Sequence, residues 1–109
     1  MLSDQSSGAN GSQATTYHVL VDDNFHYRDE RERYSLGTFA TCAEATAACR
    51  RIVDEFLLDQ YKPGMDAVDL CRLYTGFGED PFIVSADPAC RFSAWTYATA
   101  RCAEICITR

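Results

Sequence analysis

The sequence lacks any apolar run of the roughly 18 residues that a membrane-spanning helix needs. Its N-terminal segment has neither the basic start nor the apolar stretch of a secretory signal peptide. Both absences favour a cytoplasmic protein over a membrane or exported one.

Positive charge is scarce in this chain. Ten Lys and Arg residues stand against 16 Asp and Glu residues, which gives a formal net charge of -6. Proteins that bind nucleic acid non-specifically need a basic surface, so the composition argues against that function. An acidic surface instead suits a partner protein that carries basic residues.

Sequence motifs for metal or phosphate binding are also missing. The chain has no Gly-rich phosphate loop and no cofactor fingerprint, so we expect no bound cofactor. The cysteines include no CxxC pair of the kind typical of structural zinc sites, and only Cys102 and Cys106 come close to that spacing, at i and i+4 on one helical face. The six cysteines are Cys42, Cys49, Cys71, Cys90, Cys102 and Cys106.

Without an export signal, these cysteines are predicted to be reduced thiols. Cys42 is distinctive because it falls in the first turn of a predicted helix, where the free backbone N–H groups favour a thiolate. A nucleophile there would need His18 or His26 close in space. The sequence alone assigns no catalytic residue, and the balance of features is against an enzyme.

The composition is that of a small globular domain. Apolar residues make up 47% and charged residues 24% of the 109 residues, which suits one domain with a modest core. Residues 1–15 are rich in Ser, Gly, Gln and Asn and are predicted to be a disordered tail. Residues 16–109 are predicted to form a single α+β domain.

The longest periodic segment, residues 41–61, predicts the central helix. Its apolar residues recur with the spacing of one buried helical face. Thr41 and Glu44 form a capping-box pattern at its start, and Pro63 with Gly64 predicts its end. The buried face is predicted to contain Ala45, Ala48, Cys49, Ile52, Val53, Phe56 and Leu57.

The other elements are predicted from alternation, turn residues and caps. Gly37 predicts a bulge or a close backbone approach in the second strand. Gly76 predicts the end of the second helix, and Ser93 predicts the N-cap of the third helix. Apolar residues on the third helix form a stripe at Trp95, Ala98, Cys102, Ile105 and Cys106. The predicted strands cover residues 17–21, 33–39 and 82–84, and the later helices cover residues 66–74 and a segment from 93 onward.

This order of elements, β-β-α-α-β-α, predicts an α+β fold. A small antiparallel sheet would contain a hairpin with a long connecting loop and a short third strand. Three helices would pack on one face of that sheet. The first strand carries apolar residues on both faces, which places it inside the sheet.

Several short segments together resemble a family of small bacterial proteins of unknown function. The resemblance covers residues 17 to about 106 and rests on the segments VDDNFHY, ERYSLGTFAT, IVDEFL, YKPGM, GFGEDPFIV and FSAWTYA. It implies a bacterial cytosolic protein with a single domain. It implies no activity, cofactor or partner.

The acidic segment 22–30 is the first candidate site. Asp22, Asp23 and His26 offer oxygen and imidazole ligands for a metal ion. The segment does not match a calcium-binding EF-hand loop, because Tyr27 stands at the sixth position where the loop needs glycine. A metal- or nucleotide-binding, enzyme-like domain that uses this segment is therefore the alternative hypothesis.

The leading hypothesis is a non-enzymatic domain that binds another protein. Two predicted loops mix aromatic and charged residues, as protein interfaces do. Glu79 and Asp80, which precede Pro81, are expected in a turn. The proposed partner-binding residues are Phe25, Tyr27, Arg28, Phe77, Glu79 and Asp80.

Overall fold

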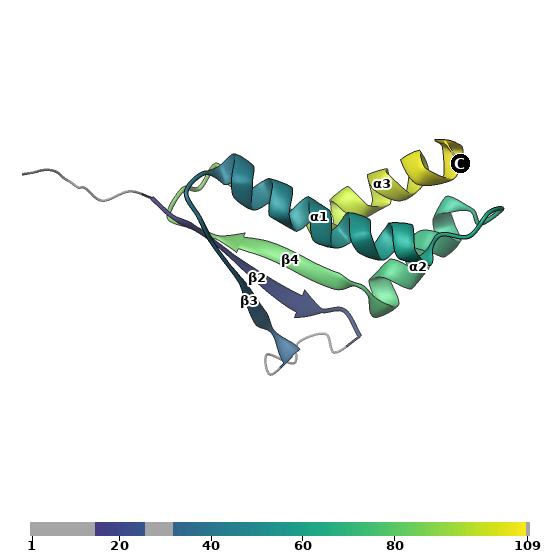
Figure 1. The fold of residues 1–109 in the computed structure, drawn as a ribbon, viewed down its shortest axis with the longest axis horizontal. Helices are drawn as coiled ribbons and strands as arrows, with labels where there is room; N and C mark the ends of the chain where they lie inside the picture. Colours follow the sequence, from purple (N-terminus) through teal and green to yellow (C-terminus); the bar gives the residue numbers. More distant parts are fainter. Residues whose placement is uncertain (1–14, 26–31, 109) are drawn as a thin grey trace, which may run out of the picture.

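The structure, a computed structural model, describes residues 15–25 and 32–108. It contains three strands and three helices in the predicted order β-β-α-α-β-α (Figure 1). The sequence-based prediction of an α+β fold with a small antiparallel sheet is confirmed. The predicted tail up to residue 14 lies outside the described residues, as do the site residues His26, Tyr27 and Arg28.

The sheet has the strand order β3-β2-β4, and both neighbouring pairs are antiparallel. Its strands are β2 (Tyr17–Asp23), β3 (Tyr34–Phe39) and β4 (Glu79–Val84). β2 is central, as its apolar residues on both faces predicted. The end of β2 at Asp23 and the start of β4 at Glu79 therefore lie side by side at one end of the sheet.

A bulge interrupts the pairing of β2 with β3. Val19 lies opposite Gly37, but the next residue, Leu20, lies opposite Ser35, so Leu36 is the extra residue. Gly37 has a φ of 145°, a conformation that side chains other than glycine's disfavour. The predicted bulge at Gly37 is confirmed.

The central helix α1 (Cys42–Gln60) has the predicted bounds. Thr41 caps its start, where the Thr41 hydroxyl accepts a hydrogen bond from the backbone N–H of Glu44 at 3.1 Å. Tyr61 caps its end through a backbone bond to Leu57. No helix within the described residues has both the length and the apolar character needed to cross a membrane.

Helix α2 (Ala67–Phe77) is longer than the sequence predicted. Asp66 caps it as expected, by accepting a hydrogen bond from the Asp69 backbone N–H at 2.8 Å. The prediction that Gly76 ends the helix was wrong. The helix continues to Phe77, and Gly78 is its C-cap. Gly78 has an extended backbone, but its N–H still donates a hydrogen bond to the Tyr74 carbonyl.

Strand β4 begins three residues earlier than predicted, at Glu79. The prediction that Glu79 and Asp80 form a turn before Pro81 was therefore wrong. β4 lies at the edge of the sheet, where one side of the strand needs no hydrogen-bond partner. An edge strand tolerates the missing N–H of proline, which explains how Pro81 fits here.

Helix α3 (Ala94–Thr108) starts where Ser93 predicted, and the Ser93 hydroxyl accepts a hydrogen bond from the Thr96 backbone N–H at 3.2 Å. Its buried stripe is Ala94, Ala98, Cys102 and Ile105. Trp95, which was predicted to belong to the stripe, is 42% exposed. The stripe passes through the preceding residue, Ala94, instead.

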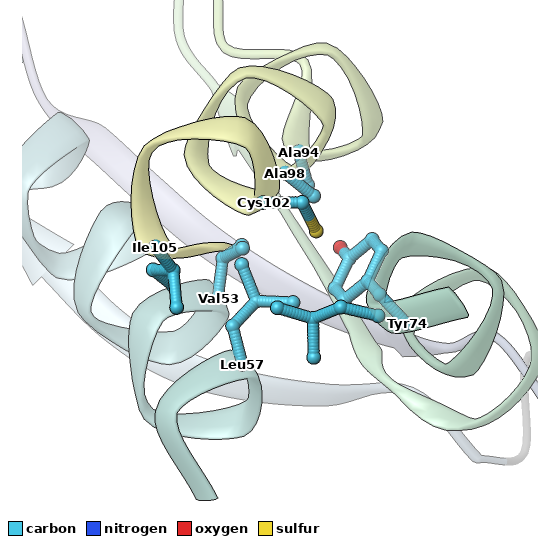
Figure 2. Packing of buried hydrophobic residues seen from close by; sticks show 8 residues of the cluster. Val53, Leu57, Tyr74, Ala94, Ala98, Cys102 and Ile105 are labelled. Carbon is cyan, nitrogen blue, oxygen red and sulfur yellow. The ribbon is translucent and has the colours of Figure 1, made fainter. Parts of the chain in front are cut away.

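The core has two parts, and α1 contributes to both. Val53 and Leu57 on α1 pack against α2 and α3 in the first part (Figure 2). Ala45 and Cys49 on α1 pack against Val19 of β2 in the second. The helices thus cover one face of the sheet.

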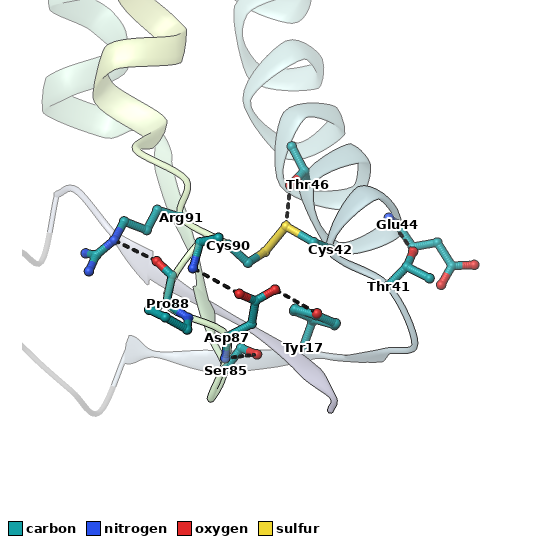
Figure 3. The surroundings of a disulfide bond; sticks show 11 residues. Tyr17, Thr41, Cys42, Glu44, Thr46, Ser85, Asp87, Pro88, Cys90 and Arg91 are labelled. Atoms are coloured by element: carbon teal, nitrogen blue, oxygen red, sulfur yellow. Dashed lines mark hydrogen bonds between the residues drawn. A yellow bond between two sulfur atoms is a disulfide. The ribbon is translucent and has the colours of Figure 1, made fainter. Parts of the chain in front are cut away.

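A disulfide joins Cys42 in the first turn of α1 to Cys90 in the loop that precedes α3 (Figure 3). The prediction that all cysteines are reduced was wrong for this pair. The two residues are 48 apart in sequence, so no local pattern could pair them. Because the Cys42 sulfur is bonded, the structure also excludes its use as a free nucleophile.

The loop around Cys90 is held by Asp87. The Asp87 carboxylate accepts a hydrogen bond from the Tyr17 hydroxyl at 2.9 Å (Figure 3). It also accepts one from the Ala89 backbone N–H at 2.9 Å. The Asp87 carbonyl accepts a third bond from the Cys90 N–H at 3.2 Å. These contacts fix the loop to the start of β2 and set the path of the chain into α3.

Candidate functional site

A pocket of about 590 Å³ lies where the sheet meets the start of α3. It combines charged residues from the strands and from the residue before β3 with aromatic residues from β4 and from the segment around the start of α3. Its lining residues are Asp22, Arg33, Asp80, Phe82, Phe92, Ser93, Ala94 and Trp95. We call this the acidic pocket.

Two carboxylates lie side by side in the acidic pocket because of the sheet register. Asp22 on β2 is the direct antiparallel partner of Asp80 on β4. Side chains alternate between the two faces of a strand, and Val21 contacts α1. Asp22 and Asp80 therefore share the face that points away from α1.

Arg33 neutralises one of these carboxylates. Its Nε lies 2.6 Å from Asp22 Oδ1, and its Nη2 lies 3.3 Å from Asp22 Oδ2. The guanidinium carbon also lies 5.2 Å from the centre of the Phe82 ring, within the range of a cation–π contact. Arg33 is thus held between Asp22 and Phe82.

Asp80 is different, because no hydrogen bond or ion pair to its side chain occurs among residues 15–25 and 32–108. The carboxyl is half-buried, and this burial, together with the nearby charge of Asp22, raises its pKa from 3.8 to about 6. A carboxylate that pays such a desolvation cost is stabilised by any cation that enters the pocket. Perturbed carboxyls of this kind are enriched at functional sites.

Asn24, which follows β2, connects that strand to α2 and α3. It is the only buried polar or charged side chain in the described part of the chain, with 7% exposure. Its amide nitrogen donates to the Tyr74 carbonyl at 2.9 Å, and its amide oxygen accepts from Trp95 Nε1 at 3.2 Å. Its backbone N–H donates to the Gly78 carbonyl at 3.0 Å. Asn24 therefore fixes Trp95 at the pocket edge.

Two exposed phenylalanines stack on each other close to Asn24. The Phe25 and Phe77 rings have centroids 5.5 Å apart and planes 20° apart. They are 63% and 61% exposed. Phe25 follows Asn24, and Phe77 precedes Gly78, the residue to which Asn24 bonds. Phe25, Phe77 and Trp95 therefore gather around Asn24, and we call them the aromatic patch.

The remaining predicted site residues lie nearby but face elsewhere. Glu79 accepts a hydrogen bond from the Tyr34 hydroxyl at 3.0 Å. Burial and the Glu79 charge raise the pKa of Tyr34 to about 12. Asp23 accepts a hydrogen bond from the Phe25 backbone N–H at 2.9 Å. Glu79 and Asp23 are partners in the sheet, on the face opposite to Asp22 and Asp80.

The proposed metal ligands do not converge in the described part of the site. Asp22 and Asp23 alternate across β2, and Asp22 is ion-paired with Arg33. His26 lies outside the described residues. Within residues 15–25 and 32–108, no group of three His, Cys, Asp or Glu side chains is placed to hold a metal ion.

The structure brings together residues that the sequence assigned to separate hypotheses. Asp22 was a metal candidate, whereas Asp80 was a partner-binding candidate in a predicted turn. Sequence reasoning did not select Phe82 or Trp95 as site residues. The cross-strand register that joins Asp22 to Asp80 is set by tertiary pairing and leaves no local signal.

Comparison of the chain with protein-family models, with curated proteins and with solved structures finds no match. The function must therefore be argued from the geometry of the acidic pocket and the aromatic patch.

Proposed function

We propose that this domain is a non-enzymatic protein-binding module whose acidic pocket and aromatic patch together bind a basic, partly apolar segment of another protein. The observation that carries the proposal is the Asp80 carboxyl, which has no hydrogen-bond or ion-pair partner among the described residues and lies in a pocket lined by aromatic rings.

Asp80 supplies the electrostatic part of the interaction. A lysine or arginine side chain that enters the pocket would relieve the repulsion between Asp80 and Asp22. Phe82, Phe92 and Trp95 line the same pocket, and aromatic rings attract cations through their faces. The pocket thus matches a long side chain with a cationic end.

The aromatic patch supplies the apolar part. Phe25 and Phe77 stay about three-fifths exposed although they stack on each other. Grouped exposed apolar side chains mark interaction surfaces more often than isolated ones do. Aromatic residues at the centre of an interface also contribute a large share of binding energy.

The overall charge favours the same class of partner. A net charge of -6 attracts basic partners over several ångströms and speeds their association at low ionic strength. The proposal therefore predicts binding that weakens as salt is added.

Affinity purification from the native host tests this proposal, with Asp80→Asn and Phe77→Ala as test variants. Each has a matched control that changes a similar exposed group elsewhere: Asp59→Asn on α1 and Val68→Ala on α2. We expect the wild type and both controls to retain a partner with a basic segment. We expect both test variants to lose it.

A synthetic peptide from that basic segment then measures direct binding by the fluorescence of Trp95, the only tryptophan in the sequence. Affinity should fall with rising salt and with Asp80→Asn. Equal partner sets for all five proteins, or a peptide that binds the domain equally at low and high salt, would rule the proposed surface out.

An enzyme-like use of the pocket is the second candidate. It is favoured by the pKa of Asp80, which at about 6 lies near the range that general acid–base catalysis requires. Its metal-dependent form is tested by adding Mg²⁺, Mn²⁺ or Zn²⁺ during thermal unfolding. Specific binding to the folded state must raise the melting temperature, so an unchanged value removes that form.

The location of the protein is also part of this proposal. The sequence favours the cytoplasm, whereas a structural disulfide such as Cys42–Cys90 persists mainly in oxidising compartments. Fractionation of the native host, with thiols trapped by alkylation at lysis, distinguishes the two. Because the Cys42–Cys90 bond is formed, we propose an oxidising compartment. Cys42 and Cys90 trapped as free thiols would overturn this location and favour the cytoplasm.

A further inference from the structure

Three of the four free cysteines gather where α2 packs on α3. Cys102 is 1% exposed and belongs to the first part of the core. Cys71 on α2 and Cys106 on α3 are half-buried and pack against that part. The fourth free cysteine, Cys49, is buried in the second part of the core, against the sheet.

Cys71 on α2 packs against the part of the core to which Cys102 on α3 belongs. The Cys71 sulfur lies 3.8 Å from the Thr99 hydroxyl oxygen, one helical turn before Cys102. The Cys102 sulfur is directed from α3 towards α2, where Tyr74 lies (Figure 2).

Solvent reaches only one side of this thiol pair. Cys71 lines a groove of about 480 Å³ between α2 and α3, whereas Cys102 does not line it. The other lining residues are Ala67, Val68, Arg72, Thr75, Thr99 and Ala103. A small molecule in this groove therefore meets the Cys71 sulfur first, with the Cys102 sulfur behind it.

We propose that Cys71 and Cys102 form a dithiol site that reacts with low-molecular-weight disulfides and closes to an intramolecular disulfide between α2 and α3. This site is independent of the acidic pocket and of the protein-binding function proposed above.

The reaction has two exchange steps. The Cys71 thiolate attacks one sulfur of a small disulfide, such as glutathione disulfide; that S–S bond breaks, a mixed disulfide forms on Cys71, and one glutathione thiolate leaves. Cys102 then loses its proton to solvent and attacks the Cys71 sulfur, which releases the second glutathione thiolate. Two protein thiols are oxidised, and one small disulfide is reduced to two thiols.

The second step is the slower one. Burial, followed by the neighbouring Cys71 and Cys106, raises the pKa of the Cys102 thiol to about 12, so its thiolate is scarce at neutral pH. The mixed disulfide on Cys71 should therefore appear first and then be replaced by the intramolecular bond. The disulfide between Cys42 and Cys90 shows that this fold accommodates cross-links between its elements.

Mass spectrometry of the full chain treated with glutathione disulfide tests the proposal. After the free thiols are blocked with N-ethylmaleimide at acidic pH, trypsin separates the relevant cysteines: Cys71 falls in residues 52–72, and Cys102 with Cys106 falls in residues 102–109. Cys42 and Cys90 fall in residues 34–50 and 73–91. The new bond is therefore distinct from the existing one.

We expect a transient adduct on residues 52–72 and then a cross-link between residues 52–72 and 102–109, with a loss of two hydrogen masses from the intact protein. Cys106→Ala should keep the cross-link. Cys102→Ala should lose it and retain the glutathione adduct on Cys71, which also shows that Cys71 still reacts in that variant.

Two results in the wild-type protein, whose folding is not in question, would overturn the proposal: an adduct that persists on Cys71 without a cross-link, and thiols that all remain free. A cross-link that is present in the wild type but absent from Cys106→Ala would also overturn it. Cys49, buried in the core with a pKa raised to about 11 by burial and then by Asp80, should stay unmodified throughout.

Discussion

Asp22 and Asp80 face each other across strands β2 and β4, and Arg33 forms an ion pair with Asp22 but not with Asp80 among the described residues. Like charges directly opposite each other in a sheet destabilise it. The ion pair with Arg33 offsets most of the electrostatic repulsion at Asp22. The Asp80 carboxylate has no such ion pair among the described residues, so the unfavourable energy remains there. The sheet therefore carries a local cost at the residue that we assign to partner binding.

This cost makes stability depend on pH in a defined direction. Because the pKa of Asp80 is raised from 3.8 to about 6, the folded protein binds this proton more tightly than the unfolded chain. The free energy of unfolding should thus fall as pH rises from about 4 to about 6. Asp80→Asn, which is neutral at every pH, should remove this fall.

We expect Asp80→Asn to stabilise the protein by roughly 1 kcal/mol more at pH 7.5 than at pH 4, since solvent around a half-exposed carboxyl screens part of the effect. Urea unfolding at both pH values measures the difference. Asp59→Asn, on an exposed part of α1, is the control and should give a much smaller pH-dependent change. Parallel behaviour of the two variants would contradict the assigned environment of Asp80.

The disulfide should contribute a large part of the total stability. Cys42 and Cys90 close a loop of 48 residues, which in the chain-entropy description corresponds to about 4 kcal/mol at 25 °C. The double variant Cys42→Ala/Cys90→Ala should lose stability on this scale, as measured by urea unfolding without reductant. Dithiothreitol should destabilise the wild type and leave the double variant almost unchanged, whereas an equal response of both would show that the loss has another origin.

Asn24 should be essential for the geometry of the site. Asn24→Ala removes one of the two hydrogen bonds to the buried Tyr74 carbonyl, which keeps its bond from the Gly78 N–H, and removes the partner of the Trp95 indole N–H. This loss should cost roughly 1–2 kcal/mol. Trp95 emission should shift to longer wavelength as the indole becomes free to move into solvent. Gln60→Ala, which removes an exposed amide that bonds only to Asp59 in the described structure, should change neither stability nor emission. Equal stability of the two variants would show that the Asn24 bonds contribute little.

Local signals in the sequence predicted the helices well. The bounds of α1 follow from Thr41 at its start and from Pro63 with Gly64 just after its end, all of which act within one turn. The bulge at Gly37 and the central position of β2 were also predictable, because alternation and glycine report on the strand itself.

The errors occur where distant segments decide the outcome. Glu79–Val84 became a strand because it pairs with β2, which overrode the turn preference of residues 79–81. Cys42 and Cys90 meet because the loop from β4 returns to the start of α1. The candidate site shares this origin: Asp22 and Asp80 were each selected from sequence, but their adjacency depends on the register of two strands.

Gly78 and Gly76 offer a matched test of how α2 ends beside the site. A Cβ at position 78 would lie 2.5 Å from Tyr74 Cδ1 and 2.9 Å from the Tyr74 carbonyl oxygen, and Tyr74 is fully buried. Gly78→Ala should therefore destabilise the protein by about 1–3 kcal/mol, as overpacking of a core does. It should also shift Trp95 emission, because Tyr74 and Gly78 both bond to Asn24.

Gly76 lies inside α2, and a Cβ there meets no atom within 4 Å. Gly76→Ala should stabilise the protein by about 0.5–1 kcal/mol, because alanine loses less conformational freedom in a helix than glycine. Urea unfolding of the two variants should give opposite signs. Destabilisation by both would mean that α2 ends at Gly76, as the sequence alone suggested, and that Glu79 and Asp80 are not held in β4 beside Asp22.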